Sequence, residues 1–100
     1  MKYKTCVVIT EKNPKKLATE VKNALKKSDF AEIRFDFLKP NDVPVALELI
    51  KKQLIKCICT LRPKNEGGKF TGSENERRSI IKLIAEYNPF LVDIEFNTLQ

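Results

Sequence analysis

The sequence of 100 residues contains no histidine and only three cysteines, Cys6, Cys57 and Cys59. Cys57 and Cys59 are one residue apart, but without histidine or a second cysteine pair four metal ligands are hard to assemble. A disulfide framework usually has an even number of cysteines in a secreted chain. Because all three cysteines lie in apolar segments, we expect reduced thiols in the core and no bound metal.

Long apolar segments are also missing, since the longest runs are only a few residues. This excludes a transmembrane helix, and the opening Met-Lys-Tyr-Lys lacks the apolar part of a signal peptide. With 42% hydrophobic and 32% charged residues, the sequence has no disordered or low-complexity stretch. We therefore expect one small cytoplasmic domain that spans residues 1–100.

Basic residues outnumber acidic ones, which gives a net charge of +6, and 15 of the 19 basic residues are lysines. Lysines spread over helix surfaces mostly confer solubility. Nucleic-acid binding is the alternative, but it needs clustered arginines and stacking aromatic side chains on one face. The aromatic residues here lie within apolar alternations, so we expect no nucleic-acid partner.

Four segments have strand character. Residues 31–38 alternate strictly, with Glu32, Arg34 and Asp36 on one side and apolar side chains on the other, which is the period of a β-strand. Residues 5–10 form a short β-branched run that predicts a buried strand. Strands are also predicted at 56–61 and at 91–97, where Asp93 and Glu95 alternate with apolar residues.

Three helices are predicted between these strands. Pro14 suits the first turn of one, Asp42 is expected to cap the second, and Ser73 with Glu76 forms a capping box at the start of the third. The expected apolar faces are Leu17, Val21, Ala24 and Leu25 in the first helix, Ala46, Leu49, Ile50 and Leu54 in the second, and Ile80, Leu83, Ile84 and Tyr87 in the third.

The resulting βαβαβαβ order predicts a parallel sheet with right-handed crossovers. An open doubly wound sheet and part of a (β/α)8 TIM barrel both have this order. Central strands of a doubly wound sheet are apolar on both faces, whereas the strands at 31–38 and 91–97 carry charges on one face. A barrel interior that serves as an active site accommodates such residues, so we predict a parallel half-barrel with the first four strands and three helices.

Three motifs occur in order and at matching spacing. Glu32-Ile-Arg34-Phe-Asp36 is similar to the second-strand E-x-R-x-D signature of type I 3-dehydroquinate dehydratases, and Thr60-Leu-Arg62 followed by Glu66-Gly67-Gly68 resembles their third-strand motif. Phe70-x-Gly72-Ser73 and Val92-Asp93-Ile94-Glu95 complete the resemblance. None of these motifs is specific alone, but together they cover almost the whole chain.

The resemblance implies a lyase of the shikimate pathway, which leads to aromatic amino acids. Such enzymes dehydrate 3-dehydroquinate to 3-dehydroshikimate through a lysine Schiff base, with a histidine as general acid and base and without a metal or cofactor. It further implies that Glu32, Arg34 and Arg62 contact the substrate and that Glu66 orients the histidine. Asp36, Asp93 and Glu95 are expected to be structural, and Gly67 and Gly68 to allow a tight loop next to the ligand.

The sequence departs from this family in three respects. It has no histidine, and no lysine lies within an apolar strand where a lowered pKa would suit a Schiff base. A complete barrel has about 250 residues, whereas this sequence has 100. We therefore expect a chain that is inactive alone and needs a C-terminal half. Three explanations of its short length remain open: truncation, a split gene and a self-associating half-barrel. The alternative function is a non-catalytic half-barrel that binds partners or itself through exposed sheet edges.

Overall fold

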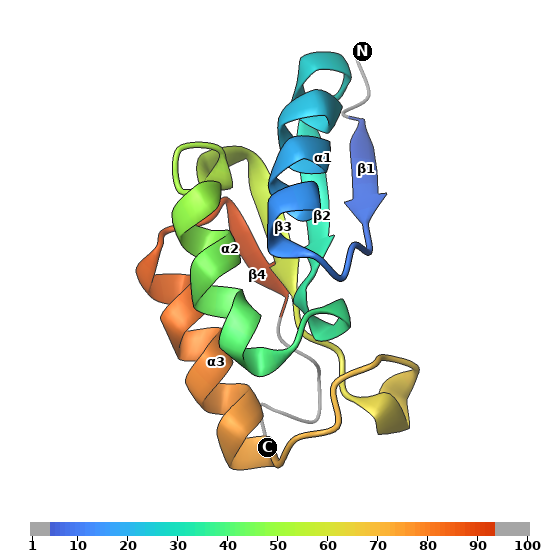
Figure 1. Ribbon diagram of the computed structural model, residues 1–100, viewed down its shortest axis with the longest axis vertical. Coiled ribbons are helices and arrows are strands. Elements are labelled where there is room, and N and C mark those ends of the chain that lie inside the picture. The colour runs from blue at the N-terminus through green and yellow to red at the C-terminus, as the bar shows by residue number, and fades with distance from the viewer. Residues whose placement is uncertain (1–4, 94–100) are drawn as a thin grey trace.

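Four parallel strands form one sheet in the order β1-β2-β3-β4 (Figure 1). The computed structural model describes residues 5–93. Each strand is followed along the chain by a helix, as far as the described residues extend. The elements are β1 Cys6–Ile9, α1 Pro14–Lys27, β2 Phe30–Arg34, α2 Val43–Leu49, β3 Cys57–Thr60, α3 Glu74–Glu86 and β4 Leu91–Asp93, with short 3-10 turns at Phe35–Phe37, Pro40–Asp42, Leu54–Lys56 and Lys64–Glu66.

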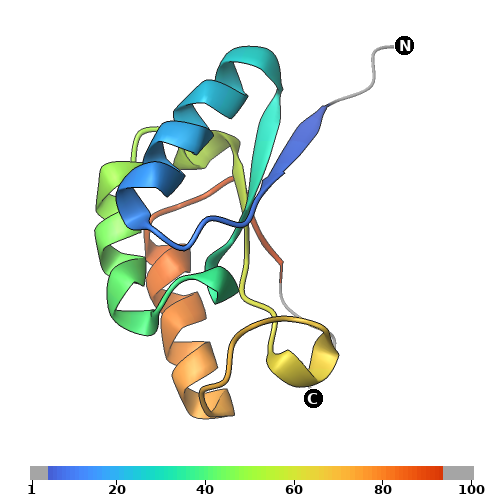
Figure 2. The same ribbon diagram turned by 45° about the vertical axis from the view of Figure 1, so that its right-hand side comes forward.

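The helices α1, α2 and α3 all pack against the same face of the sheet (Figure 2). A doubly wound sheet has helices on both faces, but no described helix lies on the opposite face here. Sequential strand order with helices on one side is the arrangement of a sector of a (β/α)8 barrel. The predicted fold class is therefore confirmed, and the open-sheet alternative is excluded.

The predicted starts of α1 and α3 are confirmed, and α1 begins at Pro14. The side chain of Asn13 accepts hydrogen bonds from the backbone nitrogens of Lys15 and Lys16, at 2.9 and 3.1 Å. Ser73 and Glu76 form a reciprocal capping box, which satisfies two backbone donors at the start of α3. The hydrogen bonds between Ser73 and the Glu76 carboxylate also lower the pKa of Glu76.

The second helix differs from the prediction. Its cap was expected at Asp42, but that side chain forms no capping hydrogen bond because a 3-10 turn precedes the helix. Leu49 was expected on the apolar face, yet it is 40% exposed and Leu47 is fully buried instead. The helix has only seven residues, so packing against α1 decides which side chains face inward.

The core lies between the sheet and the helices. Side chains of β2 and β3 that point toward the helices are fully buried, and so are the inward residues of α1 and α2. The buried apolar residues are Ile9, Leu17, Ala18, Val21, Ala31, Ile33, Phe35, Leu38, Val43, Ala46, Leu47, Ile50, Leu54, Cys57, Cys59, Leu61, Phe70 and Ile84.

Two predictions about β1 are wrong. The strand was expected to be buried, but Val8 is 54% exposed and only Ile9 is buried. Cys6 was expected in the core and is exposed, whereas Cys57 and Cys59 are buried as predicted. Cys6 and Val8 are exposed because β1 is the first strand of the sheet order and no described helix covers the face on which they lie.

No helix within residues 5–93 is long and apolar enough to cross a membrane.

Candidate active site

The face of the sheet without helices carries the polar side chains that the sequence singled out. In parallel strands, paired residues point to the same side of the sheet. Arg34 of β2 pairs with Thr60 of β3, and Thr60 pairs with Asp93 of β4, so these three lie in one row. Glu32 lies two residues before Arg34 in β2, so its side chain is on the same face of the sheet. The predicted convergence of Glu32, Arg34 and Asp93 on one face agrees with this register.

Asp36 does not continue that alternation. The strand was predicted to run to residue 38, but it ends at Arg34, and Asp36 lies in the 3-10 turn that follows. The Asp36 carboxylate accepts two hydrogen bonds from the Arg34 guanidinium, from Nε at 2.9 Å and Nη2 at 2.8 Å. It also accepts the backbone N–H of Lys69 at 2.9 Å. A buried carboxylate in a bidentate pair of this kind fixes the orientation of the guanidinium.

Arg34 is held from a second direction as well. Its guanidinium carbon lies 5.3 Å from the centre of the Phe37 ring, which is within the range of a cation–π contact. Its side chain retains 16% exposure, while that of Asp36 has none. The end of β2 therefore presents a positively charged group that is oriented by Asp36 and Phe37 of the following 3-10 turn and is still accessible to a ligand.

Glu32 is oriented by the neighbouring strand. The Thr60 hydroxyl donates a hydrogen bond to Glu32 Oε2 at 3.2 Å. Thr60 is 1% exposed, whereas Glu32 is half-buried and open to solvent. The carboxylate thus keeps accepting capacity for a polar ligand on the open face.

The loop after β3 begins with Arg62 and is shaped by two glycines. Gly67 has a φ of +84°, a backbone conformation that disfavours other residues. A Cβ on Gly68 would lie 2.0 Å from the Arg62 carbonyl oxygen, so only glycine fits. The close approach that requires Gly68 is thus to the backbone of Arg62. Phe70 N–H donates to that same carbonyl at 3.2 Å, which folds the loop back onto Arg62.

Glu66 lies in the 3-10 turn of this loop. Its Oε2 atom is buried and accepts no hydrogen bond from the described residues. A buried carboxylate oxygen without a donor is costly, so this atom is suited to accept a hydrogen bond from a group outside residues 5–93.

Arg77 is a feature that the sequence did not indicate. It lies in the first turn of α3 between Glu76 and Arg78, and both neighbours are exposed. Arg77 itself is 1% exposed, and its Nε donates to the carbonyl oxygen of Leu61 at 2.9 Å. It therefore anchors the backbone immediately before Arg62. Arg77 lies three residues before Ile80 and seven before Ile84, so its spacing places it on the predicted apolar face, whereas its charge favours the surface.

The remaining predicted residues are at the end of β4. Asp93 is exposed on the open face, next to Thr60 in the sheet. Glu95 lies outside the described residues. Within residues 5–93, no group of three or more cysteine, aspartate and glutamate side chains is arranged to hold a metal ion.

Comparison with known proteins agrees with this arrangement. A 3-dehydroquinate dehydratase from Methanothermobacter thermautotrophicus is 37% identical over 102 aligned residues, which cover 100% of this chain and 45% of that protein. The bifunctional 3-dehydroquinate dehydratase/shikimate dehydrogenase of Arabidopsis thaliana chloroplasts is 41% identical over 69 residues, 68% of this chain and 11% of that protein. The chain thus spans less than half the length of these relatives.

Solved structures share the fold. The 3-dehydroquinate dehydratase of Geobacillus kaustophilus superimposes with a TM-score of 0.80 at 21% identity, over 97% of this chain and 41% of that one. A type I enzyme from Clostridium difficile gives 0.79 at 25% identity, over 95% and 41%. The family model of type I 3-dehydroquinase matches residues 5–100. The chain therefore belongs to the type I 3-dehydroquinase family.

Proposed function

We propose that this chain is the N-terminal half of a 3-dehydroquinate dehydratase barrel, with residues 1–100 as one domain. In this proposal the assembled enzyme converts 3-dehydroquinate to 3-dehydroshikimate in the cytoplasm, as a lyase of the shikimate pathway. The relatives that carry this name are more than twice as long as the matched region. The dehydratase activity of these longer relatives is therefore proposed here for an enzyme that contains this chain.

The observation that carries the proposal is the orientation of Arg34. A guanidinium locked by Asp36 and Phe37 on the open face presents fixed donors to a ligand that bears hydroxyl and carboxylate groups. Arg62 at the end of β3 adds a second guanidinium, and Glu32 adds an acceptor for substrate hydroxyls. Such groups hold a polyhydroxy acid in one orientation, which is a large part of catalysis.

Glu66 supports the same proposal. Its unpartnered oxygen would accept the ring N–H of a histidine, which sets the tautomer of the imidazole and leaves the other nitrogen for proton transfer. This sequence has no histidine, and the lysine for a Schiff base is also expected elsewhere. Both groups would be supplied by the C-terminal half of the barrel, so the isolated chain is expected to be inactive.

The test is reconstitution. The chain is assayed for 3-dehydroshikimate by its ultraviolet absorbance, alone and with the C-terminal half of the Methanothermobacter relative. We expect no turnover alone and turnover in the mixture. In the mixture, Arg62→Lys and Glu66→Gln are expected to lower kcat/KM at least about 100-fold, since a lost transition-state contact of about 2.7 kcal/mol has that effect.

Arg78→Lys is the matched control, because Arg78 is 51% exposed on α3 and contacts Glu74. It is expected to leave turnover unchanged. Turnover by the chain alone would refute the inactivity, and a mixture that associates but stays inactive would refute the dehydratase proposal.

A second candidate is a half-barrel that binds another copy of itself without catalysis. It is favoured by the exposed apolar side chains on the open face, Val8 at 54% and Leu91 at 52%. Light scattering after size-exclusion chromatography distinguishes the candidates. A monomer at all concentrations argues against self-association.

A further inference from the structure

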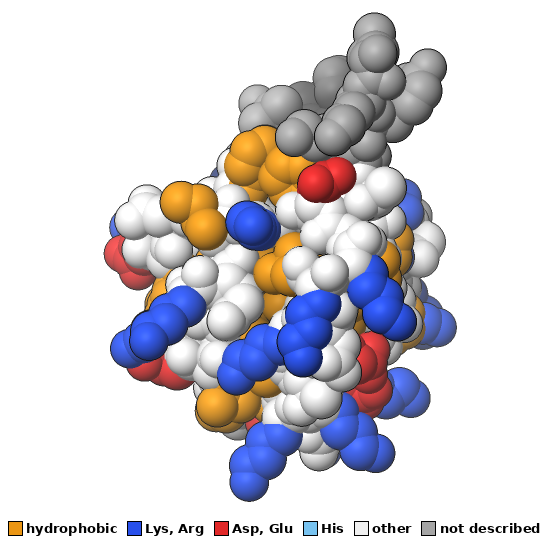
Figure 3. All heavy atoms as spheres, turned by 90° about the horizontal axis from the view of Figure 1, so that it is seen from above, with side chains coloured by type: hydrophobic (Ala, Val, Ile, Leu, Met, Phe, Trp, Pro, Cys, Tyr) orange, Lys and Arg blue, Asp and Glu red, His pale blue; other side chains and the backbone are white. Residues whose placement is uncertain are grey.

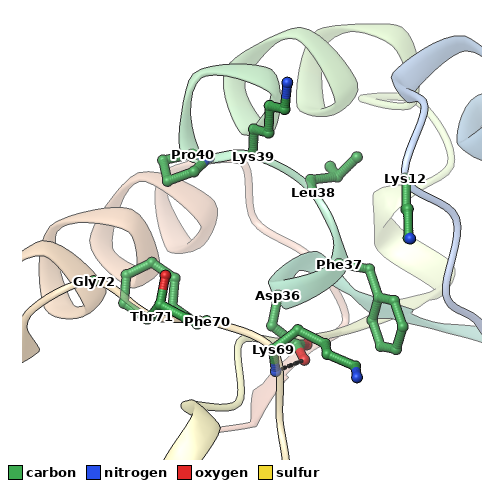
Figure 4. Close-up of a pocket in the computed structure, with 10 residues that line it drawn as sticks. All are labelled: Lys12, Asp36, Phe37, Leu38, Lys39, Pro40, Lys69, Phe70, Thr71 and Gly72. Atoms are coloured by element: carbon green, nitrogen blue, oxygen red, sulfur yellow. Dashed lines mark hydrogen bonds between the residues drawn. The ribbon is translucent and has the colours of Figure 1, made fainter.

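A pocket of about 340 Å³ lies where the loops after β1, β2 and β3 meet (Figure 4). None of the predicted substrate residues Glu32, Arg34 and Arg62 lines it, although Asp36, which pairs with Arg34, does. Its volume is within the range of sites that hold small molecules. Neither the proposed substrate contacts nor the core explains this pocket.

The pocket has one lysine from each of the three loops, Lys12, Lys39 and Lys69. In Figure 4, Lys12 and Lys69 both extend toward the side of the pocket where Phe37 lies, while the Lys39 ammonium points away from it. Within the described part of the chain, none of these three ammonium groups is in an ion pair. The two ammonium groups of Lys12 and Lys69, which extend toward the same side of one hollow, raise the local positive potential and attract anions.

The carboxylate that lines the pocket does not neutralise these lysines. Asp36 is paired with the guanidinium of Arg34 and also accepts the backbone N–H of Lys69, which is marked in Figure 4. Because its charge is compensated by Arg34 at 2.8 Å, the ammonium groups of Lys12 and Lys69 leave the pocket with a net positive charge.

This arrangement differs from the other basic side chains of the protein. At the amino ends of the strands, Figure 3 shows lysine and arginine side chains scattered over the surface among polar, acidic and apolar groups. A hollow there is also lined by lysines, Lys26, Lys27 and Lys56, but the carboxylate of Asp29 lines it as well. Around the pocket, Lys12 and Lys69 come from two separate loops, and the carboxylate that lines the pocket is paired with Arg34.

The pocket also has an apolar side. Phe70 and Leu38 are buried, and the half-buried Phe37 lies across the pocket from Phe70 (Figure 4). A Cβ on Gly72 would lie 2.5 Å from the Phe70 ring, so the glycine lets this ring lie against the backbone. Thr71 contributes a hydroxyl at the rim. An occupant can therefore place carbon atoms on the rings and its charge near the lysines.

We propose that this pocket binds a small molecule that carries a phosphoryl group. Lysine ammonium groups bind anions as compact point charges, so a phosphoryl group with a charge of about -2 is attracted more strongly than a carboxylate with a single charge. No arginine lines the pocket among the described residues. The dehydratase substrate has no phosphoryl group, so this inference is independent of the proposed function.

The test is an NMR titration of the isotopically labelled chain at constant ionic strength with phenyl phosphate, inorganic phosphate and benzoate. The two phosphoryl probes are expected to give saturable shifts of backbone amides at residues 12, 37–39 and 69–72. Benzoate, which has the ring but not the phosphoryl group, is expected to bind at least about 10-fold more weakly. Tighter binding of phenyl phosphate than of phosphate identifies an organic phosphate as the occupant, and equal binding identifies phosphate itself.

The double variant Lys12→Met/Lys69→Met is expected to weaken phosphate binding at least about 10-fold, since each lost charge removes part of the attraction. Lys22→Met/Lys82→Met removes two exposed lysines of α1 and α3 that do not line the pocket, and it is expected to bind like the original chain. The proposal is overturned by shifts that do not saturate, by equal losses in the two double variants, or by benzoate that binds as tightly as phenyl phosphate.

Discussion

The two faces of the sheet contrast in burial and in chemistry. On the face that carries the helices, Ile33 and Cys59 are fully buried among apolar neighbours. On the other face, Val8 and Leu91 are each more than half exposed, and the row that contains Arg34 is polar. The same strands supply both faces, because alternate residues point to opposite sides.

Residues that stabilise the fold therefore alternate along each strand with residues that are available for function. Apolar burial on the helix face provides most of the driving force for folding, so its residues are constrained by packing. The apolar residues Val8 and Leu91 on the open face contribute little burial, and the buried polar residue there, Thr60, orients its neighbour Glu32. Arg34 and Asp36 are the clearest case, since their pairing orients a charge that remains accessible.

The largest expected difference between the faces is in stability. Ile33→Ala is expected to lower the free energy of unfolding by about 2–5 kcal/mol, because it leaves a cavity in the core. Val8→Ala removes a side chain that is already 54% exposed and is expected to cost no more than about 1 kcal/mol. Urea unfolding followed by circular dichroism measures both. Equal losses would mean that the open face is covered in solution.

The cysteines report the same contrast through their reactivity. Burial raises the pKa of Cys57 to about 12 and raises that of Cys59 as well, so both are protonated at pH 8 and inaccessible. Cys6 is exposed on the open face, although burial and Glu32 raise its pKa somewhat. We expect one thiol to react with a disulfide reagent roughly 100-fold faster than the other two, which need local opening.

Cys6→Ser serves as the control and is expected to remove the fast phase alone. Because thiolate is the reactive form, the fast phase is expected to accelerate as the pH rises toward the raised pKa of Cys6. Three thiols that react at one rate in the folded protein would show that the two faces are equally protected.

The features that the sequence predicted well are those set by local rules. The alternation of residues 31–34, the capping box at Ser73 and the helix start at Pro14 each depend on neighbours within a few residues. The strand and helix order then implied a parallel sheet, and the charged row of Glu32 and Arg34 distinguished a barrel from an open sheet.

The features that it missed depend on distant contacts. The strand was expected to continue past Arg34, but Asp36 turns back to meet the backbone of Lys69, which is 33 residues away. Burial of Arg77 depends on the position of Leu61, 16 residues earlier. Exposure of Cys6 follows from the place of β1 in the sheet order. Arg77 has the helical spacing of the apolar face, three residues before Ile80 and seven before Ile84, but the other two features have no periodic signal.

The smallest expected effect tests whether polar contacts on the open face are dispensable for folding. Thr60→Val keeps the shape of the side chain but removes the hydroxyl that donates to Glu32. Water reaches Glu32 and can replace the lost donor, so the expected loss is only about 0.5–1.5 kcal/mol in urea unfolding. Thr60→Ser keeps the hydroxyl and serves as the control for that hydrogen bond. A loss from Thr60→Val as large as that from Ile33→Ala would mean that the open face contributes to folding as much as the core. The assignment of stability to one face and function to the other would then be wrong.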